Sequence, residues 1–83
     1  MKAMFEVGKF NIDIAGKAGH FDEYDLVIIS EFDKDTEIDR RTLYVQNADL
    51  LHELSELEVC SIMKMCNYAK FRLYRAIGLS IIG

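Results

Sequence analysis

The sequence predicts an α+β fold: a three-stranded antiparallel β-meander followed by a short helix and a long C-terminal helix packed on one face of the sheet. Two observations predict it. Apolar and polar residues alternate along the N-terminal half, and apolar residues step by three and four along the C-terminal half. The chain has 83 residues, which suits one domain spanning residues 1–83. So short a chain buries only about 60–65% of its unfolded surface, so binding to a partner or to a second copy would add burial.

The first strand is expected at residues 4–14. The apolar residues change parity between Val7 and Phe10, because Phe5 and Val7 are odd-numbered and Phe10 and Ile12 are even-numbered. One strand cannot change parity without an irregularity, so we expect a bulge or strong bend at Gly8-Lys9.

Two further strands follow. Residues 24–32 contain an apolar run at 26–29, which is typical of a central strand covered on both faces. Val27 and Ile29 are expected on the second face of the sheet, where a second subunit or the C-terminal tail would cover them. Residues 41–46 alternate and are rich in β-formers. Short connections favour an antiparallel meander with the second strand in the middle.

The helices are expected after Asn47, a good N-cap for a short helix over 48–54. Ser55 and Glu58 form an S-x-x-E capping box, which predicts a break and a new helix start at Ser55. The long helix is then expected from Ser55 to Ile77, with a core stripe at Val59, Ile62, Cys66, Ala69, Leu73 and Ala76. The apolar tail, 79–83, could pair on a sheet edge or enter a dimer interface.

Charge is distributed unevenly along the chain. Between His20 and Asp39 there are eight acidic residues and one lysine, whereas the segment from Val59 onward has four basic residues and no acid. The polar connection between the second and third strands carries Asp33, Asp35, Glu37 and Asp39. This run is a solvated face that aids solubility, an acidic surface that binds a basic partner or mimics a phosphate backbone, or a surface through which the acidic end of one copy binds the basic helix of another.

The predicted long helix has a second face, on which aromatic and basic residues are interleaved. Such a face is typical of protein interfaces, a homodimer included. It could instead pack beneath the short helix, or stack bases and neutralise phosphates, although the net charge of −4 disfavours nucleic acid. Its members are Leu57, Ser61, Lys64, Tyr68, Phe71, Arg72 and Arg75.

The patterns for catalysis and metal binding fail. A Ca²⁺ loop starting at Asp33 would need Gly at its sixth position and Glu at its twelfth, where the chain has Ile38 and Tyr44. Cys60 and Cys66 lack the spacing of a zinc site. No nucleophile stands at a recognisable spacing from either histidine. We therefore expect no cofactor, no metal and no enzymatic activity.

The function expected is that of a small, acidic, non-enzymatic protein-binding module that inhibits or modulates a larger basic partner. Small acidic inhibitors that phages deploy against nucleic-acid-binding host machinery share this size and charge, which is an analogy and not a family resemblance. A nucleic-acid-binding regulator using the basic-aromatic helix face is the alternative. The N-terminus lacks an apolar signal segment and the cysteines cannot pair on one helix, so a cytoplasmic location is expected.

Overall fold

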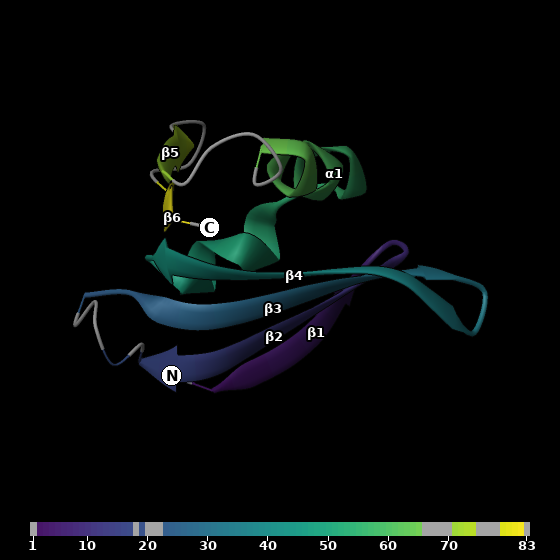
Figure 1. The fold of residues 1–83 in the computed structure, drawn as a ribbon, viewed down its shortest axis with the longest axis horizontal. Coiled ribbons are helices and arrows are strands. Elements are labelled where there is room, and N and C mark those ends of the chain that lie inside the picture. The colour runs from purple at the N-terminus through teal and green to yellow at the C-terminus, as the bar shows by residue number, and fades with distance from the viewer. Residues whose placement is uncertain (1, 18, 20–22, 66–70, 75–78, 83) are drawn as a thin grey trace.

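The sheet begins with an antiparallel meander of four strands, not three. The computed structural model describes residues 2–17, 19, 23–65, 71–74 and 79–82. The meander consists of β1 (Ala3–Val7), β2 (Phe10–Lys17), β3 (Asp25–Asp33) and β4 (Thr36–Gln46) (Figure 1). Beyond β4 the sheet continues with β6 (Leu79–Ile82) and then β5 (Phe71–Tyr74), in the order β1-β2-β3-β4-β6-β5. The prediction that residues 24–32 form an inner strand is confirmed, because β3 pairs with β2 and β4.

The extra strand arises at Gly8-Lys9, where the predicted bend is in fact a two-residue hairpin turn. Val7 pairs with Phe10 across the turn, and Gly8 has φ 56°, at the position where type II′ turns place glycine. Paired residues share a face of the sheet, so an odd-numbered residue of β1 lies beside an even-numbered residue of β2. The parity change in the sequence therefore marks a reversal of the chain.

The segment predicted as a polar connection, Asp33 to Asp39, is mostly part of the two strands of a second hairpin, β3 and β4. Only Lys34 and Asp35 form its turn, and Asp33 pairs with Thr36. The register shifts between Glu31 and Phe32, which face Asp39 and Glu37 respectively, so Ile38 is an extra residue in β4.

A short and a longer helix lie on one face of the sheet. The short one is a 3₁₀-helix, η1 (Ala48–Glu53), with Asn47 at its N-cap in the left-handed region. The helix α1 (Glu56–Met65) starts where the capping box predicted: the Ser55 amide donates to Glu58 Oε1 at 3.0 Å, and the Glu58 amide donates to Ser55 Oγ at 3.2 Å.

The predicted long helix from Ser55 to Ile77 is wrong, because residues 71–74 form strand β5. Phe71 to Tyr74 pair with Ile82 to Leu79, and β6 in turn pairs with the end of β4. The pairing of β5 with the nearby β6, and of β6 with the distant β4, thus overrides the helical spacing of the apolar residues. The apolar tail was predicted either to pair on a sheet edge or to enter a dimer interface, and in the structure its residues 79–82 pair with strands of the sheet.

The core lies between the sheet and the two helices (Figure 1). Val27 and Ile29 are fully buried in it, so their predicted place on the exposed face is wrong. Val59 and Ile62 are buried as predicted. Three other members of the predicted core stripe, Cys66, Ala69 and Ala76, lie outside the described residues. The core consists of Phe10, Ile12, Ile14, Val27, Ile29, Leu43, Val45, Ala48, Leu51, Leu54, Val59, Ile62, Met63, Leu79 and Ile81. A small single-domain α+β protein is therefore confirmed, with a different strand count and helix length. In the described part of the chain, no helix is long and apolar enough to cross a membrane.

Candidate functional site

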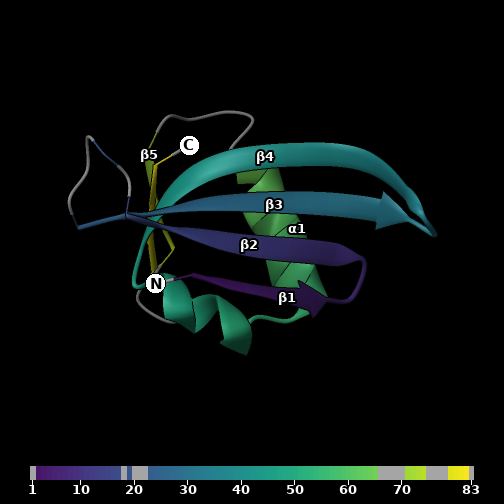
Figure 2. The ribbon, with the colours of Figure 1, turned by 90° about the horizontal axis from the view of Figure 1, so that it is seen from below.

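The side of the meander turned away from η1 and α1 is here called the open face. Figure 2 views the strands from this side, and α1 lies behind them. Strand pairing places thirteen residues on it: Met4, Glu6, Asn11, Asp13, Gly16, Leu26, Ile28, Ser30, Phe32, Glu37, Arg40, Thr42 and Tyr44. None of the described helices covers this side of the meander, although Ser30 is itself buried among its neighbours.

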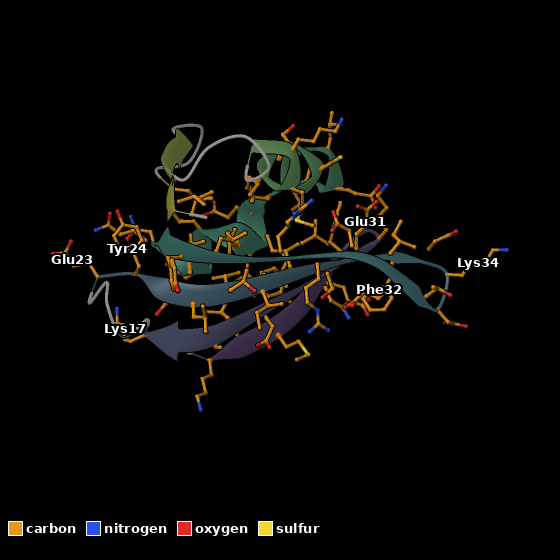
Figure 3. The ribbon with its side chains drawn as sticks, in the orientation of Figure 1. Lys17, Glu23, Tyr24, Glu31, Phe32 and Lys34 are labelled. Atoms are coloured by element: carbon orange, nitrogen blue, oxygen red, sulfur yellow. The ribbon has the colours of Figure 1, made fainter. Side chains whose placement is uncertain are left out.

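The open face combines apolar and polar side chains. Met4 is 71% exposed, which is high for a large apolar residue. Leu26, Ile28 and Phe32 are half-buried. In Figure 3, Phe32 lies on the open side of the sheet, whereas its neighbour Glu31 lies on the helix side. An apolar surface of this kind, interleaved with polar groups, is typical of sites where proteins bind one another.

Two hollows shape the open face. One, of about 190 Å³, lies between Met4, Ile28 and Arg40. The other, of about 400 Å³, lies between the two hairpin turns and is lined by Glu6 and Asp35 among others. Asn11 and Phe32 line both hollows, so the two adjoin. Together they form a depression in the open face into which a side chain of a partner could insert.

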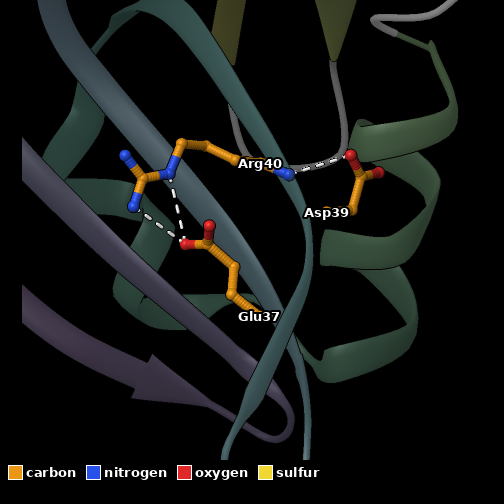
Figure 4. Close-up of polar contacts among 3 residues, drawn as sticks. All are labelled: Glu37, Asp39 and Arg40. Carbon is orange, nitrogen blue, oxygen red and sulfur yellow. Dashed lines mark hydrogen bonds and ion pairs between the residues drawn. The ribbon is translucent and has the colours of Figure 1, made fainter.

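Arg40 and Glu37 form the main ion pair of the open face (Figure 4). Arg40 donates from Nη2 and Nε to Glu37 Oε1, at 2.9 and 3.2 Å. Three residues apart in a regular strand they would lie on opposite faces, but the extra residue Ile38 brings them to the same one. The hydrogen bond from Arg40, followed by one from Ser30, holds the pKa of Glu37 below its ordinary value.

A second set of polar contacts lies on the helix side around Lys9, and one of them joins α1 to the sheet. The Lys9 amide in the first hairpin turn donates to Glu56 Oε2 at 2.7 Å. The Lys9 ammonium lies 3.1 Å from Glu31 Oε2, and the hydrogen bond between them raises the pKa of Lys9. A Cβ built on Gly8 would overlap the Glu56 carboxylate, so a larger residue would require this side chain to move, and the positive φ of Gly8 itself favours glycine. The hydrogen bond from the Lys9 amide to Glu56 joins α1 to this turn.

The four predicted acidic residues divide into two kinds. Asp33 and Asp35 are exposed at the tip of the β3–β4 hairpin. Glu37 pairs with Arg40, and Asp39 lies 3.5 Å from Arg41 and accepts a hydrogen bond from the Arg40 amide at 2.8 Å. The charge of the predicted acidic surface is therefore partly neutralised by two arginines immediately beyond its boundary.

The predicted basic-aromatic helix face does not form. Phe71 and Arg72 belong to β5, whereas Lys64 is exposed on α1. Tyr68 and Arg75 lie outside the described residues. Side chains repeat about every 3.6 residues along a helix and every two residues along a strand. The helical spacing of these residues therefore does not place them on one face of the structure.

Sequence reasoning missed Met4, Arg40 and Thr42 as surface candidates. The signal for Met4 was the change in parity of the apolar residues at Gly8-Lys9. If this change is interpreted as a hairpin turn, Met4 and Glu6 pair with Asp13 and Asn11 and lie on the face opposite the core.

No three His, Cys, Asp or Glu residues among those described come together to hold a metal ion. Comparison with protein-family models, with curated proteins and with solved structures finds no match. The open face must therefore be interpreted from its own chemistry.

Proposed function

We propose that this protein is a small, non-enzymatic protein-binding module that uses the open face to occupy a surface of a larger partner. The observation that carries the proposal is that face itself: Met4 is largely exposed, and Ile28 and Phe32 remain half-buried beside two adjoining hollows. A small protein buries little apolar surface by folding alone, and a partner bound to the open face would bury the apolar surface that is left exposed there.

The charge of this surface supports a partner with basic groups. Within the described part of the chain, no ion pair engages Glu6 and Asp13 on the open face, or Asp33 and Asp35 at the adjoining hairpin tip. A partner that presents lysine or arginine around an apolar centre would complement this arrangement. Inhibition or modulation, by covering a basic site that the partner uses for another ligand, is the specific role we propose.

A nucleic-acid-binding role is not proposed. It depended on Tyr68, Phe71 and Arg72 sharing a helix face, and β5 includes two of these three residues. The charged groups of the open face that no described ion pair engages are the carboxylates of Glu6 and Asp13, and carboxylates repel phosphates.

The proposal is tested by capturing partners from cells that contain this protein, with Thr42→Lys as the disrupting variant. Thr42 is exposed on the open face beside Ile28, so a lysine there would repel the basic groups of the partner. We expect the bait protein to retain a specific partner and Thr42→Lys to weaken binding of that partner, once purified, at least about tenfold, which corresponds to 1.4 kcal/mol. Because the charge interactions contribute, raising the salt concentration should also slow association.

Leu57→Lys is the matched control. Leu57 is 77% exposed on α1, on the other side of the molecule from the open face, so the change adds the same charge to another exposed position. A partner that Leu57→Lys releases and Thr42→Lys retains would show that the open face is not the binding surface.

A further inference from the structure

Strand β1 forms one edge of the sheet. Val7 and Phe10 flank the two-residue turn, so these two residues exchange backbone hydrogen bonds. The direction of the backbone groups alternates along an antiparallel strand, so Phe5 and Ala3 also bond toward β2. The amide and carbonyl groups of Met4 and Glu6 therefore point outward from the sheet, available to another strand.

The residues along this edge are complementary to themselves. Aligned antiparallel with a second copy and centred on Met4, the segment Lys2-Ala3-Met4-Phe5-Glu6 places Lys2 of each copy opposite Glu6 of the other. Ala3 then faces Phe5, a small residue against a large one, and Met4 faces Met4. In this register, the outward-pointing groups of Met4 and Glu6 meet outward-pointing groups of the second copy.

We propose that the protein forms a two-fold symmetric homodimer through this edge, with the two sheets joined at β1. Opposite-charge pairs and apolar pairs directly across strands each stabilise pairing. Lysine at an edge usually discourages strand addition, but here each Lys2 finds Glu6 of the second copy. The 71% exposure of Met4 also fits, because its side chain would be covered at the two-fold axis.

The occupant we infer is a second copy rather than an unrelated strand, because the segment's own sequence supplies the opposite charges and the small and large residues that this register pairs. The two-fold axis runs perpendicular to the sheet, so both open faces point the same way and form one continuous surface. On the other side, the ring of His52 stacks on Phe5 at 3.8 Å between centroids, which brings η1 close to the joint. The inference goes beyond the proposed function, since the dimer could form whether or not a partner binds.

The test is sedimentation equilibrium of the full chain over a concentration series, with two charge reversals and their combination. The wild type should move from the monomer mass of 9.6 kDa toward twice that value. Lys2→Glu and Glu6→Lys each create two like-charge pairs, so each should weaken association about tenfold. The double variant restores opposite charges across the joint and should recover the wild-type dissociation constant.

Lys34→Glu and Asp33→Lys make the same charge changes at the far hairpin tip and should leave association unchanged. Met4→Pro removes an outward amide that β2 does not use, so it should abolish the dimer while the melting temperature of the monomer stays close to the wild type. A chain that stays monomeric at every concentration would overturn the proposal. So would association that the single reversals leave intact or that the double reversal fails to restore.

Discussion

The two faces of the meander use the same four strands for opposite purposes. On the helix-covered face Phe10, Ile12 and Ile29 are almost completely buried. On the open face Met4 is largely exposed, and Ile28, which adjoins Ile29 in sequence, is half-buried. Neither backbone pairing nor strand propensity distinguishes the two faces. Only the presence of η1 and α1 does.

The difference separates stability from binding. Burial of apolar surface contributes about 25 cal/mol per Å², so the helix-covered face supplies most of the free energy of folding. The open face contributes less and keeps apolar groups accessible, so substitutions on it should affect binding more than folding. Variants of adjacent residues can test this division directly.

The largest expected effect is that of Ile29→Ala compared with Ile28→Ala. Ile29 is fully buried, so its truncation should lower the free energy of unfolding by about 2–5 kcal/mol. Ile28 is half-buried, so the same change should cost about 1 kcal/mol. Urea unfolding of both variants measures the difference.

The two isoleucines are matched controls for each other, because they are adjacent in β3 and lose the same atoms. Equal losses would mean that the open face is covered in solution, and that the contrast between the faces does not hold. A dilution series would then show whether a second copy provides the cover.

The part of the fold that could be predicted depends on signals close in sequence. Ser55 and Glu58 are three residues apart, so their capping box identified the helix start correctly. The alternation around Phe10 and Ile12 identified β2. The same alternation failed at Gly8-Lys9, since a bulge and a two-residue turn both change the parity of apolar positions.

The C-terminal part could not be predicted, because β6, the strand that pairs with β5, in turn pairs with β4, which is distant in sequence. The apolar steps at Val59 and Ile62 are truly helical, and Leu73 continues the spacing although it belongs to β5. The preference of this segment for a strand comes from β6 and, through it, from β4, some thirty residues earlier in the chain. Likewise, a charge count ending at Asp39 could not show that Arg40 and Arg41 turn back to neutralise it.

The next largest effect concerns the contact that joins the helices to the hairpin. Gly8→Ala introduces a methyl group where the Glu56 carboxylate lies and requires an L-residue at φ 56°. Since a left-handed conformation alone costs about 1–2 kcal/mol, we expect a loss of about 2–3 kcal/mol in unfolding experiments. Gly19→Ala is the control, because a methyl group there meets open space and should be nearly neutral.

Glu56→Ala separates the two causes. It removes the carboxylate that obstructs the methyl group, together with the hydrogen bond from the Lys9 amide. In this background Gly8→Ala should cost less than in the wild type, leaving mainly the backbone strain. Strictly additive losses would mean that the Glu56 carboxylate does not obstruct a methyl group at Gly8.

The smallest effect is a pH dependence specific to the open face. Glu37 has its pKa lowered by the hydrogen bonds from Arg40 and Ser30, so its carboxylate contributes stability above the ordinary carboxyl pKa, about 4.3. That contribution should be lost as the pH falls below this value and through the lowered pKa of the folded state. Arg40→Gln should raise the pKa of Glu37 toward its ordinary value, which NMR titration of the side-chain carboxyl carbon measures.

Arg41→Gln breaks only the pair with Asp39 and should leave the titration of Glu37 unchanged. If Arg41→Gln shifts the pKa of Glu37 and Arg40→Gln does not, the extra residue Ile38 does not place Glu37 and Arg40 on the same face, and the open face lacks its main ion pair.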